Sequence, residues 1–150
     1  MKIILIVIGC FGVAFAEVAK FEKCYGWSDD ICKVAEVRIN PCKNKNFCVL
    51  KKGQQSSIEF DFTPMFNAQR LTSSLFWASP TGDLPFDKFT DVDACLYSTC
   101  PTVSGTQQQL SYSLRLDKFI PNGIYTLKWR LWDAEDESKE CCFKTNVKIR

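Results

Sequence analysis

The side chains in this sequence that could do chemistry are its cysteines and carboxylates, because it contains nine cysteines and no histidine. Without histidine, acyl transfer and thiol catalysis lack their usual general base. Zinc binding is also disfavoured, because the C-x-x-C pairs and histidines typical of zinc sites are missing from the sequence. The cysteines therefore indicate disulfide chemistry rather than catalysis or metal binding.

A carboxylate pair for glycoside hydrolysis is the remaining enzymatic alternative. The candidate carboxylates fall in predicted loops, where solvated charge is the usual explanation: Asp91, Asp93, Asp133, Glu135 and Asp136. We therefore predict a protein that is not an enzyme, with no catalytic residues, no cofactor and no metal.

The first sixteen residues have the pattern of a secretory signal peptide. Lys2 supplies the positive charge, residues 3–13 form an apolar run, and Ala14-Phe15-Ala16 is an A-x-A cleavage signal. The apolar run is too short to span a bilayer, and a lipid anchor at Cys10 is a weaker alternative because the run continues past it. We predict one domain over residues 17–150, secreted to the extracellular space or to the lysosomal lumen.

Eight cysteines follow the predicted cleavage site, at positions 24, 32, 42, 48, 95, 100, 141 and 142. An even number in an exported chain indicates disulfides, although eight cysteines allow 105 pairings and spacing alone does not choose among them. The formal net charge of +2 includes Lys2, so the mature domain is nearly balanced. That balance argues against a nucleic-acid partner or a polybasic membrane binder.

The elements that must position these residues are strands. In residues 124–133, Tyr125, Leu127, Trp129 and Leu131 alternate with Thr126, Lys128, Arg130 and Trp132, which predicts one buried face and one face towards water. A polar run at 134–140 separates this strand from a second alternating segment at 141–150. We predict a long antiparallel hairpin.

Four further segments alternate in the same way and are predicted as strands: 35–40, with Ala35, Val37 and Ile39 on one face, 57–62, 71–77 and 110–116. Phe76 and Trp132 lie on the opposite faces of their strands. Turn signals separate the segments, and none has the pattern of an amphipathic helix. The prediction is an all-β fold of two antiparallel sheets packed face to face.

Several motifs, taken in order, resemble the ML (lipid-recognition) domain family. The similarity is greatest to its Niemann–Pick type C two branch (epididymal secretory protein-like) in the arthropod form, which is related to the mite group-two allergens. The matching motifs are V-R-I-N-P-C at 37–42, C-V-L-K-K-G at 48–53, I-E-F-D-F-T-P at 58–64, L-F-W-A-S at 75–79, L-P-F at 84–86, D-A-C-L-Y-S-T-C-P at 93–101, L-K-W-R-L-W-D at 127–133 and C-C-F at 141–143.

The resemblance implies an immunoglobulin-like β-sandwich with an internal apolar cavity between its sheets. It also implies the disulfides Cys42–Cys48, Cys95–Cys100 and Cys24–Cys142. Strand parity supports the last pair, because Cys142 shares the outer face with Lys144 while Cys141 lies on the side of Phe143. Two cysteines exceed the family's six, so we predict a fourth bridge, Cys32–Cys141, with swapped partners as the main alternative.

Carrying the family's sterol-contacting positions over gives Phe86, Leu116 and Ile120. The inward faces of the predicted strands supply the other candidate cavity residues: Phe60, Phe62, Leu75, Trp77, Tyr112, Leu114, Leu127, Trp129, Leu131, Phe143 and Val147. For any one of these, filling an ordinary core is the better explanation, and Trp129 is expected to be structural. Ile120 and a proline-poor loop before Phe86 depart from the sterol-transfer pattern and favour fatty acids or other small hydrophobes. Lys88 or Lys118 could meet a carboxylate at the rim, although solvated lysine is the simpler explanation.

The predicted function is a secreted, monomeric carrier of a small hydrophobic ligand, such as a fatty acid, a sterol or a similar semiochemical. A membrane or a receptor would be its transient acceptor. The alternative is a recognition or immune module with a filled core that binds protein or glycan through its surface, using exposed aromatics such as Phe76 and Trp132.

Overall fold

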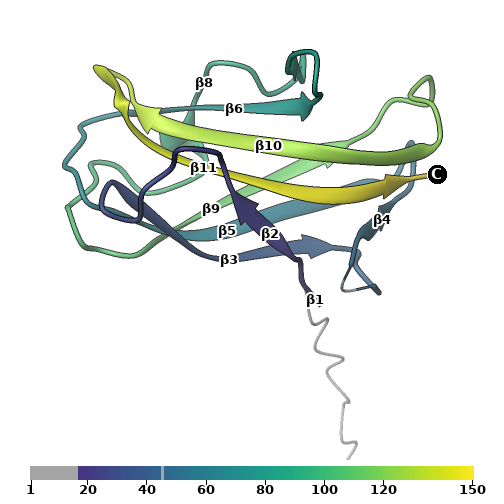
Figure 1. The fold of residues 1–150 in the computed structure, drawn as a ribbon, viewed down its shortest axis with the longest axis horizontal. Coiled ribbons are helices and arrows are strands. Elements are labelled where there is room, and N and C mark those ends of the chain that lie inside the picture. The colour runs from purple at the N-terminus through teal and green to yellow at the C-terminus, as the bar shows by residue number, and fades with distance from the viewer. Residues whose placement is uncertain (1–16, 45) are drawn as a thin grey trace, which may run out of the picture.

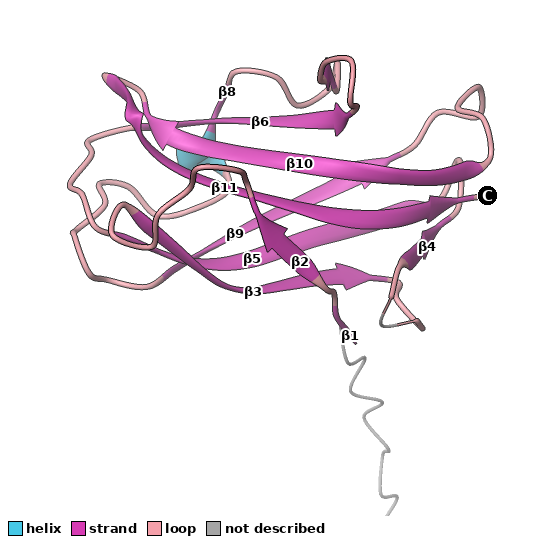
Figure 2. Cartoon of the chain, in the orientation of Figure 1, coloured by secondary structure: helices cyan, strands magenta, loops and turns pink. Residues whose placement is uncertain are grey.

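The computed structural model describes residues 17–44 and 46–150 (Figure 1). The predicted signal peptide, residues 1–16, lies outside this range. The described chain is all-β apart from one turn of 3-10 helix, η1 (Ala94–Leu96), as Figure 2 shows. None of its helical residues forms a span with the length and hydropathy needed to cross a bilayer. The predicted fold class, two sheets packed face to face, is confirmed.

The smaller sheet has four antiparallel strands in the order β1 (Glu17–Val18), β3 (Cys32–Asn40), β5 (Gln55–Pro64) and β9 (Gln108–Arg115). Buried and partly exposed residues alternate along β5, as its sequence predicts. The inward residues of this sheet include Ile58, Phe60 and Phe62, all fully buried.

The larger sheet is built on the predicted hairpin of β10 (Gly123–Asp133) and β11 (Asp136–Ile149), and β6 (Leu71–Ala78) pairs with the other side of β10. Short strands that the sequence did not reveal complete it: β2 (Phe21–Lys23) and β4 (Cys48–Leu50) beside β11, and β7 (Leu84–Pro85) and β8 (Val92–Asp93) beside β6. Among the described strands, every pair is antiparallel except β4 with β11.

Two details of the predicted strands are wrong. The run 134–140 is not a loop between strands, because β11 begins at Asp136 and Glu140 lies opposite Trp132 in the ladder. Ala35 does not share the buried face of Val37: a β-bulge between Val34 and Glu36 inserts an extra residue, which turns Ala35 outwards.

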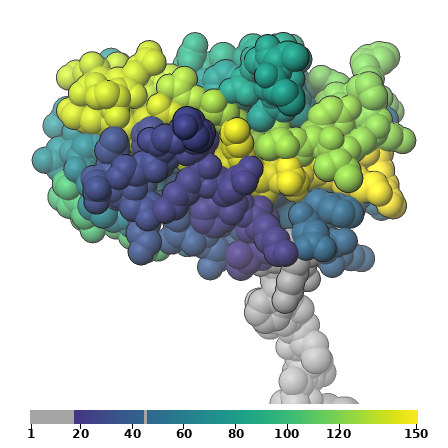
Figure 3. Space-filling view, viewed as in Figure 1, coloured from purple at the N-terminus to yellow at the C-terminus, as the bar shows by residue number. Residues whose placement is uncertain are grey.

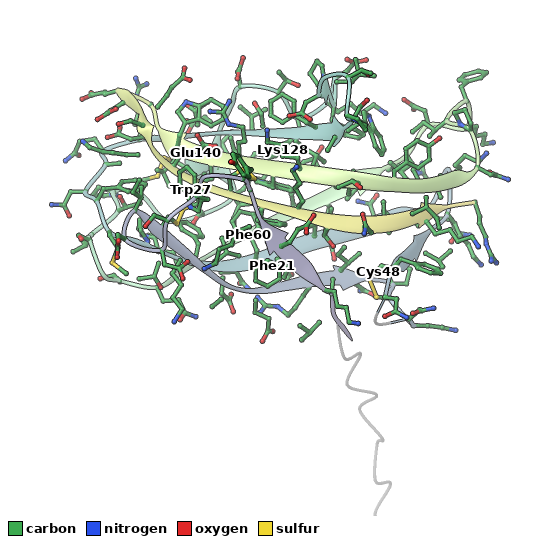
Figure 4. The ribbon with its side chains drawn as sticks, in the orientation of Figure 1. Phe21, Trp27, Cys48, Phe60, Lys128 and Glu140 are labelled. Carbon is green, nitrogen blue, oxygen red and sulfur yellow. A yellow bond between two sulfur atoms is a disulfide. The ribbon has the colours of Figure 1, made fainter. Side chains whose placement is uncertain are left out.

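Aromatic side chains hold the two sheets together at the centre of the sandwich. Phe60 of β5 lies between the sheets in Figure 4, with its ring centroid 5.4 Å from that of Trp129 and 4.9 Å from that of Phe143. The rings of Trp129 and Phe143 are themselves stacked, with centroids 6.4 Å apart. The sheets are therefore in direct contact at mid-length.

Four disulfides join the expected partners. Cys42–Cys48 and Cys95–Cys100 close short loops, while Cys24–Cys142 and Cys32–Cys141 join residues 118 and 109 positions apart. Because Cys141 and Cys142 point to opposite faces of β11, one bridge crosses the core to β3 and the other ties down the N-terminal segment. That segment lies against the C-terminal strand in Figure 3, and β2 is paired with β11.

Candidate functional site

A pocket of about 190 Å³ opens at the end of the sandwich where β6 ends and β10 begins. We call it the end pocket. One side is the segment after β7, positioned by two hydrogen bonds of 2.8 Å, from the Phe86 amide to the Leu75 carbonyl and from the Phe89 amide to the Phe86 carbonyl. The other side is the segment after β9. The lining residues are Trp77, Pro85, Phe86, Asp87, Lys88, Asp117 and Ile120.

The inner wall of the end pocket is aromatic. The ring of Trp77 packs edge-on against Phe86, with centroids 5.6 Å apart, and against Tyr125, at 5.3 Å. The Tyr125 hydroxyl donates a 2.8 Å hydrogen bond to the Pro121 carbonyl, which fixes that ring beside the segment containing Ile120. Trp77 and Phe86 therefore offer mainly ring carbon to the pocket, and the hydroxyl of the neighbouring Tyr125 is already bonded.

The rim carries charge. Lys88 Nζ lies 3.0 Å from the Asp117 Oδ1, and both side chains are more than half exposed. An exposed ion pair of this kind contributes little stability. Because it joins two sides of the pocket, Lys88 is not the free rim cation considered from the sequence. Lys118 instead lays its aliphatic chain beside Gly53.

The interior beyond the end pocket is filled by a second group of rings. Phe89 is fully buried, with its centroid 4.2 Å from Tyr112 and 4.9 Å from Trp129. Burial, with the neighbouring Tyr97, raises the pKa of the Tyr112 phenol, so this group is uncharged at neutral pH. Phe89 was missed from the sequence because it lies in a loop, where no alternation marks a residue as inward.

Of the candidate cavity residues, Trp77, Phe86 and Ile120 are brought together at the end pocket. Tyr112 is half-buried in the aromatic group below it. Leu116 is buried, and its carbonyl accepts a 2.9 Å hydrogen bond from the Gly53 amide. The remaining candidates are buried in the core: Phe60, Phe62, Leu75, Leu114, Leu127, Trp129, Leu131, Phe143 and Val147.

The two aromatics considered for surface recognition differ in exposure. Trp132 is only 6% exposed, because the Arg130 guanidinium lies 4.9 Å above its ring and is held there by two hydrogen bonds to Glu140. Phe76 is partly exposed and lies opposite Lys128 in the ladder. Trp132 is therefore not available as a surface anchor.

Fold and site together define a class: a disulfide-linked sandwich of two β-sheets with an aromatic-walled pocket at one end. The family model of the ML domain matches residues 18–149. The chain is 45% identical to an MD-2-related lipid-recognition protein of Manduca sexta over 147 residues, which cover 97% of this chain and 95% of that protein. The chain therefore belongs to the ML domain family.

More distant relatives agree with this assignment. The mite group 2 allergen Der p 2 of Dermatophagoides pteronyssinus is 25% identical over 122 residues, which cover 79% of this chain and 80% of the allergen. The crystal structure of a Niemann–Pick type C2 protein from the Japanese carpenter ant superposes with a TM-score of 0.71 at 19% identity, covering 87% of this chain and 99% of that chain. The family predicted from the sequence motifs is confirmed. At 19% identity, the similarity to the ant protein concerns the fold alone.

Proposed function

We propose that this protein is a secreted carrier that binds a small hydrophobic ligand, such as a fatty acid or a sterol, with the end pocket as its entrance. The observation that carries the proposal is the cluster of Trp77, Phe86 and Ile120 at an opening between the sheets. Such a wall accepts an apolar chain without stranding polar groups. The relative in Manduca sexta, named as a lipid-recognition protein, supports the same class of ligand.

The ligand would occupy the half of the interior nearest the pocket. The pocket's volume of about 190 Å³ is smaller than the roughly 300–1,000 Å³ of sites that bury a drug-sized ligand. Binding would therefore require Trp77 and Phe86, which touch only edge-on, to move apart, and a longer chain would also have to displace Phe89 from Tyr112. The contacts of Phe60 with Trp129 and Phe143 would form the floor and limit how deep a chain can reach.

The energetics favour such a ligand. Each buried methylene contributes about 0.8 kcal/mol, so about ten of them offset a substantial part of the cost of association. Since the pocket depth is bounded by the aromatic floor, affinity should rise with chain length and then level off or fall. A rigid sterol would demand a larger displacement of the wall than a flexible fatty acid.

The test is displacement of a fluorescent apolar probe from delipidated, correctly oxidised protein by a fatty-acid length series and a sterol. Competition that peaks at one chain length would support the carrier and report the pocket's depth. Strong sterol competition would assign the ligand class to sterols. Absence of probe binding by protein shown to be folded would refute the carrier and leave the recognition module with a filled core. A monomer that hands its ligand to a membrane or receptor acceptor is part of the same proposal.

A further inference from the structure

A second concavity, of about 420 Å³, lies at the same end of the sandwich as the end pocket and is larger than it. We call it the cationic groove. It lies where β3 leads into the Cys42–Cys48 loop, beside β4 and the end of β11. Its lining residues are Pro41, Lys43, Val49, Lys51, Gln54 and Arg150. Its volume falls within the range of about 300–1,000 Å³ typical of small-molecule sites.

Among the described residues, three cationic side chains line the cationic groove, against one anionic group, the main-chain carboxylate of Arg150. Lys43, Lys51 and Arg150 all line it, and no aspartate or glutamate is among its lining side chains. Within the described residues, none of these three cations is among the ion pairs shorter than 4.0 Å, whereas Lys23, Lys88, Lys128 and Lys139 all have carboxylate partners. These exposed cations gathered around one concavity give it a net positive potential, which attracts anions.

The groove is not wholly polar. Pro41 and Val49 contribute carbon surface, and Gln54 adds an amide that can donate or accept a hydrogen bond. A bare ion would leave the apolar part of the lining uncovered. The chemistry therefore fits an anion with an organic portion attached, and a phosphate ester matches both the cations and the carbon surface.

The walls of the groove are fixed by the main chain. The Lys52 amide donates at 2.9 Å to a main-chain carboxylate oxygen of Arg150, and the Arg150 amide donates to the Leu50 carbonyl at 3.1 Å. On the far side of the same turn, the Lys52 Nζ donates to the Ile120 carbonyl at 3.1 Å. The turn that carries Lys51 is thereby joined to the segment that lines the end pocket, so the two sites are neighbours with separate linings.

We propose that the cationic groove is a binding site for the phosphate-ester headgroup of an anionic amphiphile or of a soluble phosphate ester. Lys43, Lys51 and Arg150 would neutralise the phosphate, and Pro41 and Val49 would contact the carbon next to it. The site is distinct from the end pocket, and its occupancy does not depend on the lipid-carrier proposal.

The test uses the full mature chain, uniformly labelled for amide NMR. Inorganic phosphate, glycerol phosphate, and vesicles of phosphatidylcholine with or without an equal amount of phosphatidylglycerol are added separately. We expect glycerol phosphate to shift the amides of Val49, Lys51 and Gln54 more than inorganic phosphate does, with binding that weakens as salt is added. Binding only to vesicles that contain phosphatidylglycerol would identify a membrane headgroup as the source; binding of soluble glycerol phosphate would show that a free ester suffices.

The decisive variants are Lys51→Glu and Arg150→Glu, with Lys33→Glu as the matched control. Lys33 is an exposed lysine of β3 outside the groove, and its substitution changes the net charge equally. We expect each groove variant to weaken vesicle binding at least about five-fold per charge removed, while Lys33→Glu has a much smaller effect. Equal losses in all three variants, or no binding of any phosphate probe by the folded wild-type chain, would overturn the proposal.

The apolar-probe assay distinguishes failure of the cationic-groove proposal from failure of the lipid-carrier proposal. The groove variants should retain probe displacement, because none of their substituted residues lines the end pocket. Loss of probe binding with intact phosphate shifts would count against the end pocket alone.

Discussion

The indole Nε1 of Trp129 donates a 2.8 Å hydrogen bond to the Oγ of Ser73, and both residues are almost fully buried. The serine hydroxyl in turn donates to the Arg130 carbonyl at 2.8 Å. A single hydroxyl thus satisfies the one polar atom of the largest ring in the core, and it joins β6 to β10. Burying an indole N–H without such a partner would cost a large part of the gain from burying the ring.

Ser73→Ala should lower the free energy of unfolding by about 1–3 kcal/mol, because it leaves the Trp129 N–H buried without an acceptor. Denaturant unfolding followed by tryptophan fluorescence measures the change. Ser113→Ala, on the exposed face of β9, is the control and should alter stability little. Equal effects at the two serines would contradict the role assigned to this hydrogen bond.

Trp129→Ala should cost more, about 3–5 kcal/mol, because the ring contacts Phe60, Phe89 and Phe143 from both sheets. Thermal unfolding compared with Trp27→Ala, a half-buried indole at the N-terminal segment, separates the central ring from a peripheral one. A small loss at Trp129 would mean that the aromatic floor is not what holds the sheets together.

Phe86→Ala should weaken binding of the apolar probe while leaving most of the stability in place, because the ring lies at the entrance rather than at the centre. Phe66→Ala is a close control: both phenylalanines are 7% exposed and both follow a strand, but Phe66 does not line the end pocket. Comparable stability losses with a binding defect in Phe86→Ala alone would support the site. Unchanged binding in Phe86→Ala would remove it from the entrance.

The two long-range disulfides should behave non-additively. Cys24–Cys142 and Cys32–Cys141 close almost the same long loop. Once one of them is formed, the other closes only a short loop through residues 24–32. Replacing either pair by alanine should cost about 2–3 kcal/mol, whereas replacing both should cost about 7 kcal/mol and unfold a marginally stable domain. Denaturant titration of the three variants measures this, and peptide mapping without reduction checks the pairing: a Cys24–Cys141 peptide would contradict it.

The outer face of the smaller sheet predicts a pH dependence. Arg38 donates two hydrogen bonds of 2.8 Å to the two carboxylate oxygens of Asp61, and this lowers the pKa of the Asp61 carboxyl below its ordinary value. Since the folded pKa is depressed, the stabilisation is present above the ordinary carboxyl pKa and is lost as pH falls through the folded value.

Asp61→Asn should therefore destabilise the domain by about 1–3 kcal/mol at neutral pH, and the gap to wild type should close under acid conditions. Urea unfolding across the acid range follows this gap. Asp87→Asn, an exposed carboxylate at the rim of the end pocket, serves as the reference. A gap at Asp61 that stays constant down to strongly acid pH would show that the loss comes from packing rather than from charge.

The strands of the fold were predictable because their side chains repeat with a period of two. Leu127, Trp129 and Leu131 alternate with charged residues, and all three are buried as the pattern requires. The same period predicted the wrong face for Ala35, because a β-bulge shifts the register there. No residue type at that position indicates a bulge. The period placed Trp132 on the outward face correctly, but it could not show that the long side chain of Arg130 covers that ring.

The candidate site depended on a different kind of information. Phe86 and Ile120 came from resemblance to family motifs, since residues 34 positions apart in two loops share no periodicity. Phe89 could not be found by either route, because its burial is decided by Tyr112 and Trp129, which reach it from both sheets. The cationic groove was equally hidden, because Lys43, Lys51 and Arg150 converge only once β4 pairs with β11.

The adjacent attachment points at Cys141 and Cys142 have a mechanical consequence. Tension applied between the two ends of the domain passes from residue 24 directly into residue 142 through a covalent bond. Only the short stretches outside this link can extend, so pulling by the ends should yield a contour-length gain of a few residues rather than of a whole domain. Trp77, Phe86 and Ile120 all lie inside the bypassed loop, so the wall of the end pocket carries no load until the disulfide is reduced.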